Sequence, residues 1–86
     1  MSVVEQLKMA LADAAKHING QIAAISQYKA ETDKLKPQID QAVSGTSNQS
    51  AINMKIQIGH TPEQLEKAIQ NLKRAQETLE NIMRTL

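Results

Sequence analysis

The stretch TPEQLEKAIQNLKRAQETLENIMRTL, residues 61–86, decides the fold of this chain. Leu65, Leu72, Leu79 and Leu86 recur seven residues apart, and further apolar side chains widen the row into a stripe. Glu63 precedes Lys67 by four residues, as Glu80 precedes Arg84, which is the spacing of ion pairs on a helix surface. Thr61 and Gln64 match a capping box, and Pro62 suits the first position of a helix. The pattern predicts a helix over residues 62–85.

The first half of the chain carries the same period. From Val4 to Ala42, apolar or small residues recur in steps of three and four, as on one side of an amphipathic helix. We therefore expect one helix over about residues 3–43. Pro37 removes a backbone donor and crowds the carbonyl of Asp33, so we predict a bend near Pro37. A full break is disfavoured, because the apolar stripe continues in phase through Leu35 and Ile39.

Two segments interrupt these patterns. Residues 44–50, SGTSNQS, contain no apolar side chain and predict a turn, which includes Ser44 and Gly45 and begins beside Val43. The second interruption, residues 59–62 (GHTP), predicts a break in the chain's helical structure between Gly59 and Pro62.

The segment between the interruptions, residues 51–58, is ambiguous. Its apolar residues alternate with polar ones, as in a strand, but no other segment alternates and could pair with it. A short helix over about 51–58, capped by Asn48 or Ser50 and stopped at Gly59, is the preferred prediction. A strand here would have to pair with another protein.

The resulting fold prediction is an all-α, antiparallel two-helix hairpin formed by a single domain, residues 1–86. Two helices bury one seam between them, whereas the apolar stripes are wide. We therefore predict assembly into a helical bundle through homo-oligomer or hetero-oligomer contacts. The expected partner interface contains the central apolar residues of both arms: Leu11, Ile18, Ile22, Ile25, Leu65, Ile69, Leu72, Leu79 and Ile82.

Composition narrows the functional classes. The chain has one Tyr, no Phe, Trp or Cys, and a net charge of +1, so it offers neither aromatic stacking platforms nor a basic nucleic-acid footprint. His17 and His60 lie far apart and lack the spacing of paired metal ligands. The leucine repeat has no basic helix upstream, as a DNA-binding zipper requires.

We accordingly expect no catalytic, cofactor-binding or metal-binding residues and no enzymatic activity. Nucleic acid, small-molecule substrates and membrane insertion are likewise not expected. The partner should be a protein that packs its helices against this chain.

One family resemblance rests on the turn. Val43-Ser44-Gly45, set between two helical patterns in a chain of under a hundred residues, resembles the Trp-x-Gly turn of the WXG-type small proteins of type VII secretion, although the Trp is absent. Residues 65–72 also resemble that family's second helix. Its export element, Tyr-x-x-x-Asp/Glu, is not matched, since Tyr28 lies in the first arm and is followed by Thr32.

This resemblance implies a targeting or chaperone subunit that binds a helical partner, similar to the small proteins encoded beside LXG-type toxins. Two alternatives stay open: a self-assembling structural subunit of needle-like or phage origin, and a small helical adaptor or inhibitor. Because the N-terminal region has no uninterrupted apolar segment, we expect a cytoplasmic protein. Export by a route that uses no cleaved signal peptide stays open.

Overall fold

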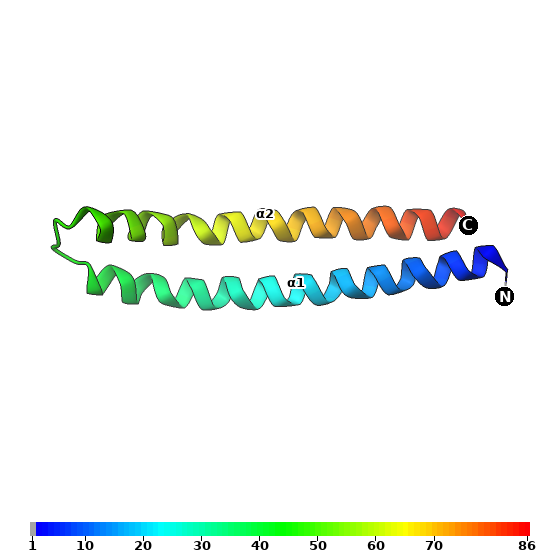
Figure 1. Cartoon of the computed structure of the whole chain (residues 1–86), viewed down its shortest axis with the longest axis horizontal. Helices are drawn as coiled ribbons and strands as arrows, with labels where there is room; N and C mark the ends of the chain where they lie inside the picture. The colour runs from blue at the N-terminus through cyan, green and yellow to red at the C-terminus, as the bar shows by residue number, and fades with distance from the viewer. Residues whose placement is uncertain (1) are drawn as a thin grey trace.

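The computed structural model describes residues 2–86 and contains two long helices. Helix α1 spans Val3–Ala42 and α2 spans Gln49–Thr85, and the two run antiparallel along a rod of 66 × 15 × 15 Å (Figure 1). The start of α1 and the end of α2 lie at the same end of the rod, and the turn lies at the other (Figure 1). The described chain contains no strand. The predicted all-α hairpin is confirmed.

Side-chain caps define where each helix begins. The Ser2 hydroxyl accepts a hydrogen bond from the Glu5 amide at 3.1 Å, and the Asn48 carboxamide oxygen accepts one from the Ala51 amide at 3.1 Å. Each cap satisfies one of the amides that the first turn of a helix leaves unpaired. Asn48, rather than Ser50, is therefore the cap of the second helix.

The turn is shorter than predicted and depends on one glycine. Val43 ends α1, with its amide donating to the Ile39 carbonyl at 2.9 Å, and α2 already begins at Gln49. Gly45 has a φ of 76°, in the left-handed region that residues with a side chain rarely adopt. This residue reverses the chain direction between the two helices.

The predicted break between Gly59 and Pro62 is wrong. Residues 51–58 and 62–85 belong to one uninterrupted helix, so the strand alternative for 51–58 is also wrong. Thr61 does not cap a new helix, because it lies inside α2 and its hydroxyl donates to the Gln57 carbonyl at 3.0 Å.

Packing explains why α2 passes through Pro62. Proline deprives the helix of one backbone hydrogen bond, but the helix on either side of it keeps its apolar stripe facing α1. The Pro62 ring is itself buried. Burial of the ring and of the stripe offsets the missing bond. Helix α1 likewise runs unbroken through Pro37, with only a gentle curve along its length (Figure 1).

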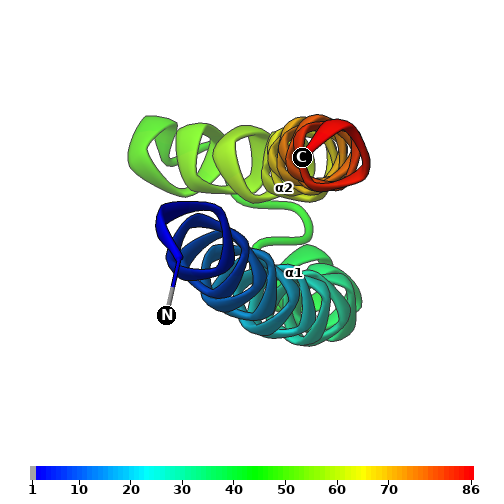
Figure 2. The same ribbon diagram turned by 90° about the vertical axis from the view of Figure 1, so that its right-hand side faces the viewer.

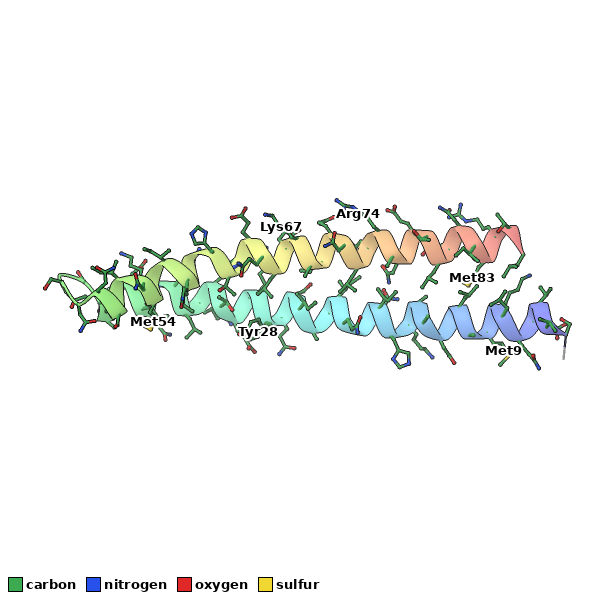
Figure 3. The ribbon with its side chains drawn as sticks, turned by 45° about the horizontal axis from the view of Figure 1, so that its top comes forward. Met9, Tyr28, Met54, Lys67, Arg74 and Met83 are labelled. Carbon is green, nitrogen blue, oxygen red and sulfur yellow. The ribbon has the colours of Figure 1, made fainter. Side chains whose placement is uncertain are left out.

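The helices meet along a seam that repeats every seven residues, as in a coiled coil, and they wind around one another (Figure 2). Met83 points toward α1, whereas Lys67 and Arg74 point away from it (Figure 3). The central residues of the seam form two rows on each helix. In α1 they are Ile18, Ile25, Thr32 and Ile39 beside Ile22, Lys29 and Lys36; in α2 they are Ile58, Leu65, Leu72 and Leu79 beside Pro62, Ile69 and Gln76.

Three polar contacts between the helices fix a single register. Lys29 pairs with Glu66 at 3.3 Å, Lys55 pairs with Asp40 at 3.6 Å, and the Gln76 amide donates to the Asn19 side chain. In each pair the two residue numbers add up to 95. Residues whose numbers add to about 95 therefore lie at the same level along the hairpin.

The hairpin buries very little. Ile69 is 5% exposed and Thr32 is 4% exposed, with the Thr32 hydroxyl donating to the Tyr28 carbonyl at 2.9 Å. Pro62 is buried as well, and the other central residues of the seam are only half-buried. A two-helix rod has no interior beyond this one seam, so its stability rests on a small number of side chains.

Truncating Ile69 should therefore be costly. We expect Ile69→Ala to lower the free energy of unfolding by about 2–5 kcal/mol, the usual cost of emptying a buried aliphatic site. Ile56→Ala is the control, because Ile56 is 53% exposed, and it should change stability by less than about 0.5 kcal/mol. Urea unfolding at a fixed protein concentration measures both; equal effects would contradict the seam described above.

Two glycines should respond in opposite directions to the same substitution. A Cβ at either Gly45 or Gly59 would meet no atom within 4 Å, so only backbone conformation differs. Gly59→Ala should stabilise the chain by roughly 0.5–1 kcal/mol, because Gly59 lies inside α2. Gly45→Ala should destabilise it by about 1–2 kcal/mol through the positive φ. Thermal unfolding of the two variants would reveal the opposite signs.

Candidate interaction surface

The residues predicted to bind a partner mainly face the other helix of the same hairpin. Eight of the nine lie in the α1–α2 seam, where their burial comes from the hairpin itself. Ile82 is the exception, since it is 40% exposed and lies beside the seam. Whether the seam residues also touch a partner remains a prediction.

One edge of the seam is polar. Each of the three polar contacts between the helices joins a residue of a seam row to a residue just outside the seam on the other helix: Lys29 to Glu66, Lys55 to Asp40, and Gln76 to Asn19. All three are on the same edge. This polar edge sets the register, and two of its three contacts are ion pairs.

Glu66 is the most engaged carboxylate of this edge. The Gln70 side-chain amide donates to it at 3.0 Å and the Lys29 ammonium at 3.3 Å, and together these hold its pKa below the ordinary value of 4.5. The hydrogen bond from Gln70 contributes most to the lowered pKa, followed by that from Lys29 and by its charge. The network fastens α2 to α1 near the middle of the rod.

The opposite edge of the seam continues into a surface almost without charge. On each helix, two rows of residues spaced seven apart lie next to this edge. Of the ten basic and nine acidic residues in the chain, only Glu31 falls in any of these rows. We call this surface the neutral face. Its inner row on α1 is Leu7, Ala14, Gln21, Tyr28, Leu35 and Ala42, and its inner row on α2 is Met54, Thr61, Ala68, Ala75 and Ile82.

Large side chains of the neutral face are left open to solvent. Tyr28 is 57% exposed and Leu35 is 45% exposed, and Leu7, Met54 and Ile82 are also exposed. Near the middle of the rod the face is hollowed into a groove of about 510 Å³ between the helices, lined by Gln21, Ala24, Ile25, Ala68, Asn71 and Leu72. The groove results from the alanines, which leave the space between the two helices unfilled.

Side-chain sizes on the neutral face follow a rule. At each level of the hairpin, one inner row carries a large residue where the other carries a small one. The level pairs are Ala14 with Ile82, Gln21 with Ala75, Tyr28 with Ala68, Leu35 with Thr61, and Ala42 with Met54, and in each pair the residue numbers add up to 96. The face is therefore uneven across its width at every level.

A second hollow, of about 290 Å³, lies near the turn on the polar edge. Its lining includes Lys36 and the paired Lys55 and Asp40. Across residues 2–86, no group of three His, Cys, Asp or Glu side chains could hold a metal ion. Neither described helix contains a stretch apolar enough to span a bilayer.

Comparison with protein-family models, with curated proteins and with solved structures found no match to this chain. The surfaces described above are therefore interpreted from their own chemistry.

Sequence reasoning missed the neutral face. The signal was present in the seven-residue spacing of Leu7, Ala14, Tyr28, Leu35 and Ala42, but Gln21 interrupts that row. The register was also needed, because only the level pairs show that large and small residues alternate across the two helices.

The polar edge makes a prediction for pH. The lowered pKa of Glu66 means that its carboxylate stabilises the folded chain fully above the ordinary value of 4.5, and that this stabilisation is lost as the pH falls through the lower folded value. Glu66→Gln should therefore lower stability near neutral pH, and its deficit relative to the original chain should shrink on acidification. Urea unfolding at several pH values measures this deficit.

Glu77→Gln is the matched control, because Glu77 is exposed on the same helix and accepts no hydrogen bond within the described chain. Its effect should be small at every pH. A Glu66→Gln deficit that stayed constant from neutral to acid pH would contradict the role assigned to the carboxylate.

Proposed function

We propose that this protein is a non-enzymatic helical interaction protein, and that it serves as a type VII secretion-associated targeting or chaperone subunit for a helical partner such as the N-terminal domain of a toxin. The observation that carries the interaction role is the neutral face, a long surface on which five large side chains are exposed. Exposed apolar surface of this extent is a mark of protein interaction sites.

The rest of the hairpin supports an interaction role over a chemical one. Two ion pairs, Lys29 with Glu66 and Lys55 with Asp40, lie along the polar edge, and the groove is lined by amide, alanine and aliphatic side chains. None of the groove-lining residues is a nucleophile or an acid–base group. Helix packing is the chemistry that such a surface performs best.

The turn supports the link to secretion. Val43-Ser44-Gly45 occupies the tip of a long helical hairpin, with Gly45 in the left-handed conformation that reverses the chain. The WXG-type proteins share this plan of a glycine turn between two helices. Two other functions remain candidates, a self-assembling structural subunit and a small helical adaptor or inhibitor, and the exposed neutral face favours either of them as well.

Deletion of the gene in the source organism tests the secretion role. We expect one large protein with a helical N-terminal region to disappear from the culture fluid while its transcript persists, because it would lack its targeting subunit. Restoring the gene should restore export. If the secreted proteins are unchanged and the purified chain forms filaments by itself, the structural-subunit alternative is correct.

A further inference from the structure

We infer that the neutral face is a dimerisation surface, and that its occupant is a second copy of this chain, packed face to face with the two turns at the same end of a four-helix bundle. This inference rests on the interaction role proposed above but not on the link to secretion.

The single hairpin exposes more surface than a compact protein of its mass. Its accessible surface is 6367 Å², whereas a compact protein of 9.5 kDa exposes about 5,000 Å². The excess of roughly 1,300 Å² per chain is larger than the ~800 Å² that each partner contributes to a standard protein interface. A face-to-face contact of standard size along the rod would therefore remove more than half of the excess.

The lack of charge on the neutral face suits contact with a second copy. A dimer with two-fold symmetry places each side chain near its own counterpart or near a residue of the same surface, so a charged face would repel its copy. The neutral face carries only Glu31 as a charge, whereas the polar edge and the outer surface carry the rest. Nearly all charged residues therefore lie on the other sides of the hairpin.

The neutral face is also complementary in shape to a second copy of itself. When two hairpins stack face to face with their turns together, α1 of one copy lies over α2 of the other at the same level. Each large side chain then faces a small one: Tyr28 meets the partner copy's Ala68, and Leu35 meets the partner copy's Thr61. The same holds for Ile82 over Ala14 and for Met54 over Ala42. Stacking with the turns at opposite ends lays α1 on α1 and loses this match.

The alternation also explains the groove. Ala24 and Ala68 leave a hollow in the middle of the neutral face, next to the exposed Tyr28 ring. In the dimer, each copy offers the large side chain that the other copy lacks at that level. The hollow is therefore a complement to the second chain, and cores filled by large side chains against small ones are well packed.

A charge placed on the neutral face tests the proposal. Light scattering and sedimentation of the purified chain should give twice the 9.5 kDa chain mass in the micromolar range. Leu35→Lys should raise the dimer dissociation constant by at least about tenfold, because two ammonium groups would be buried without partners. Helix content by circular dichroism shows whether each variant is folded.

Ile56→Lys is the matched control, because Ile56 is equally open but lies outside the neutral face. It should leave the dissociation constant unchanged. Equal effects of the two lysines, or a monomer throughout the concentration range, would overturn the proposal. If the chain stays monomeric until a different hairpin protein is added, the second copy is wrong as occupant while the proposed function stands.

Cross-linking tests the orientation. The chain contains no Cys, so an equimolar mixture of Ala14→Cys and Ile82→Cys chains can form a covalent dimer only through the introduced thiols. Turns at the same end bring residues 14 and 82 of different copies together, and mild oxidation should yield the mixed disulfide. Turns at opposite ends would separate them by roughly 30 Å along the rod at 1.5 Å per residue. A dimer that fails to cross-link, while each thiol reacts freely with maleimide, would overturn the orientation.

Discussion

Two helices lying side by side can bury only one strip of each, and every other property of this hairpin follows from how that strip is arranged. The polar contacts of the seam all lie on one edge, where Lys29, Lys55 and Gln76 reach residues just outside the seam on the other helix. They fix the register from that one edge of the strip. The other edge is left free for apolar side chains, which continue onto the surface. A single seam thus divides the molecule into a side that holds its own helices together and a side that faces outward uncharged.

The sequence predicted the hairpin because apolar residues recur in steps of three and four through both arms, and this period survives any local irregularity. The prediction of a break at residues 59–62 was wrong because it relied on a local irregularity and not on the period of the whole arm. Gly59 and Pro62 were interpreted by their local preferences, whereas burial of Pro62 within a continuous stripe outweighs the hydrogen bond that proline removes. Tertiary packing decided the outcome there, and the capping role of Thr61 disappeared with the predicted break.

The candidate surface was harder to predict than the fold. Periodicity shows which residues are apolar but not whether their neighbour is the same chain or another one, so Leu11, Ile25 and Leu72 were expected at a partner interface and lie in the hairpin's own seam. The neutral face depends on the pairing of levels across two helices. That pairing is set by contacts such as the one between Lys29 and Glu66, which are 37 positions apart in the sequence. Neither segment by itself shows a pattern that predicts such a contact.

The placement of both chain ends at one end of the rod has a mechanical consequence (Figure 1). Tension applied between the ends would peel the helices apart one level at a time, as a zipper opens, because each level carries the load only after the previous one has parted. The first levels to open contain Leu79 and Met83, and the last contain Lys55 and Asp40 beside the turn. A hairpin of this design yields gradually to a pull from its ends, while the same seam loaded along its length would resist as a whole.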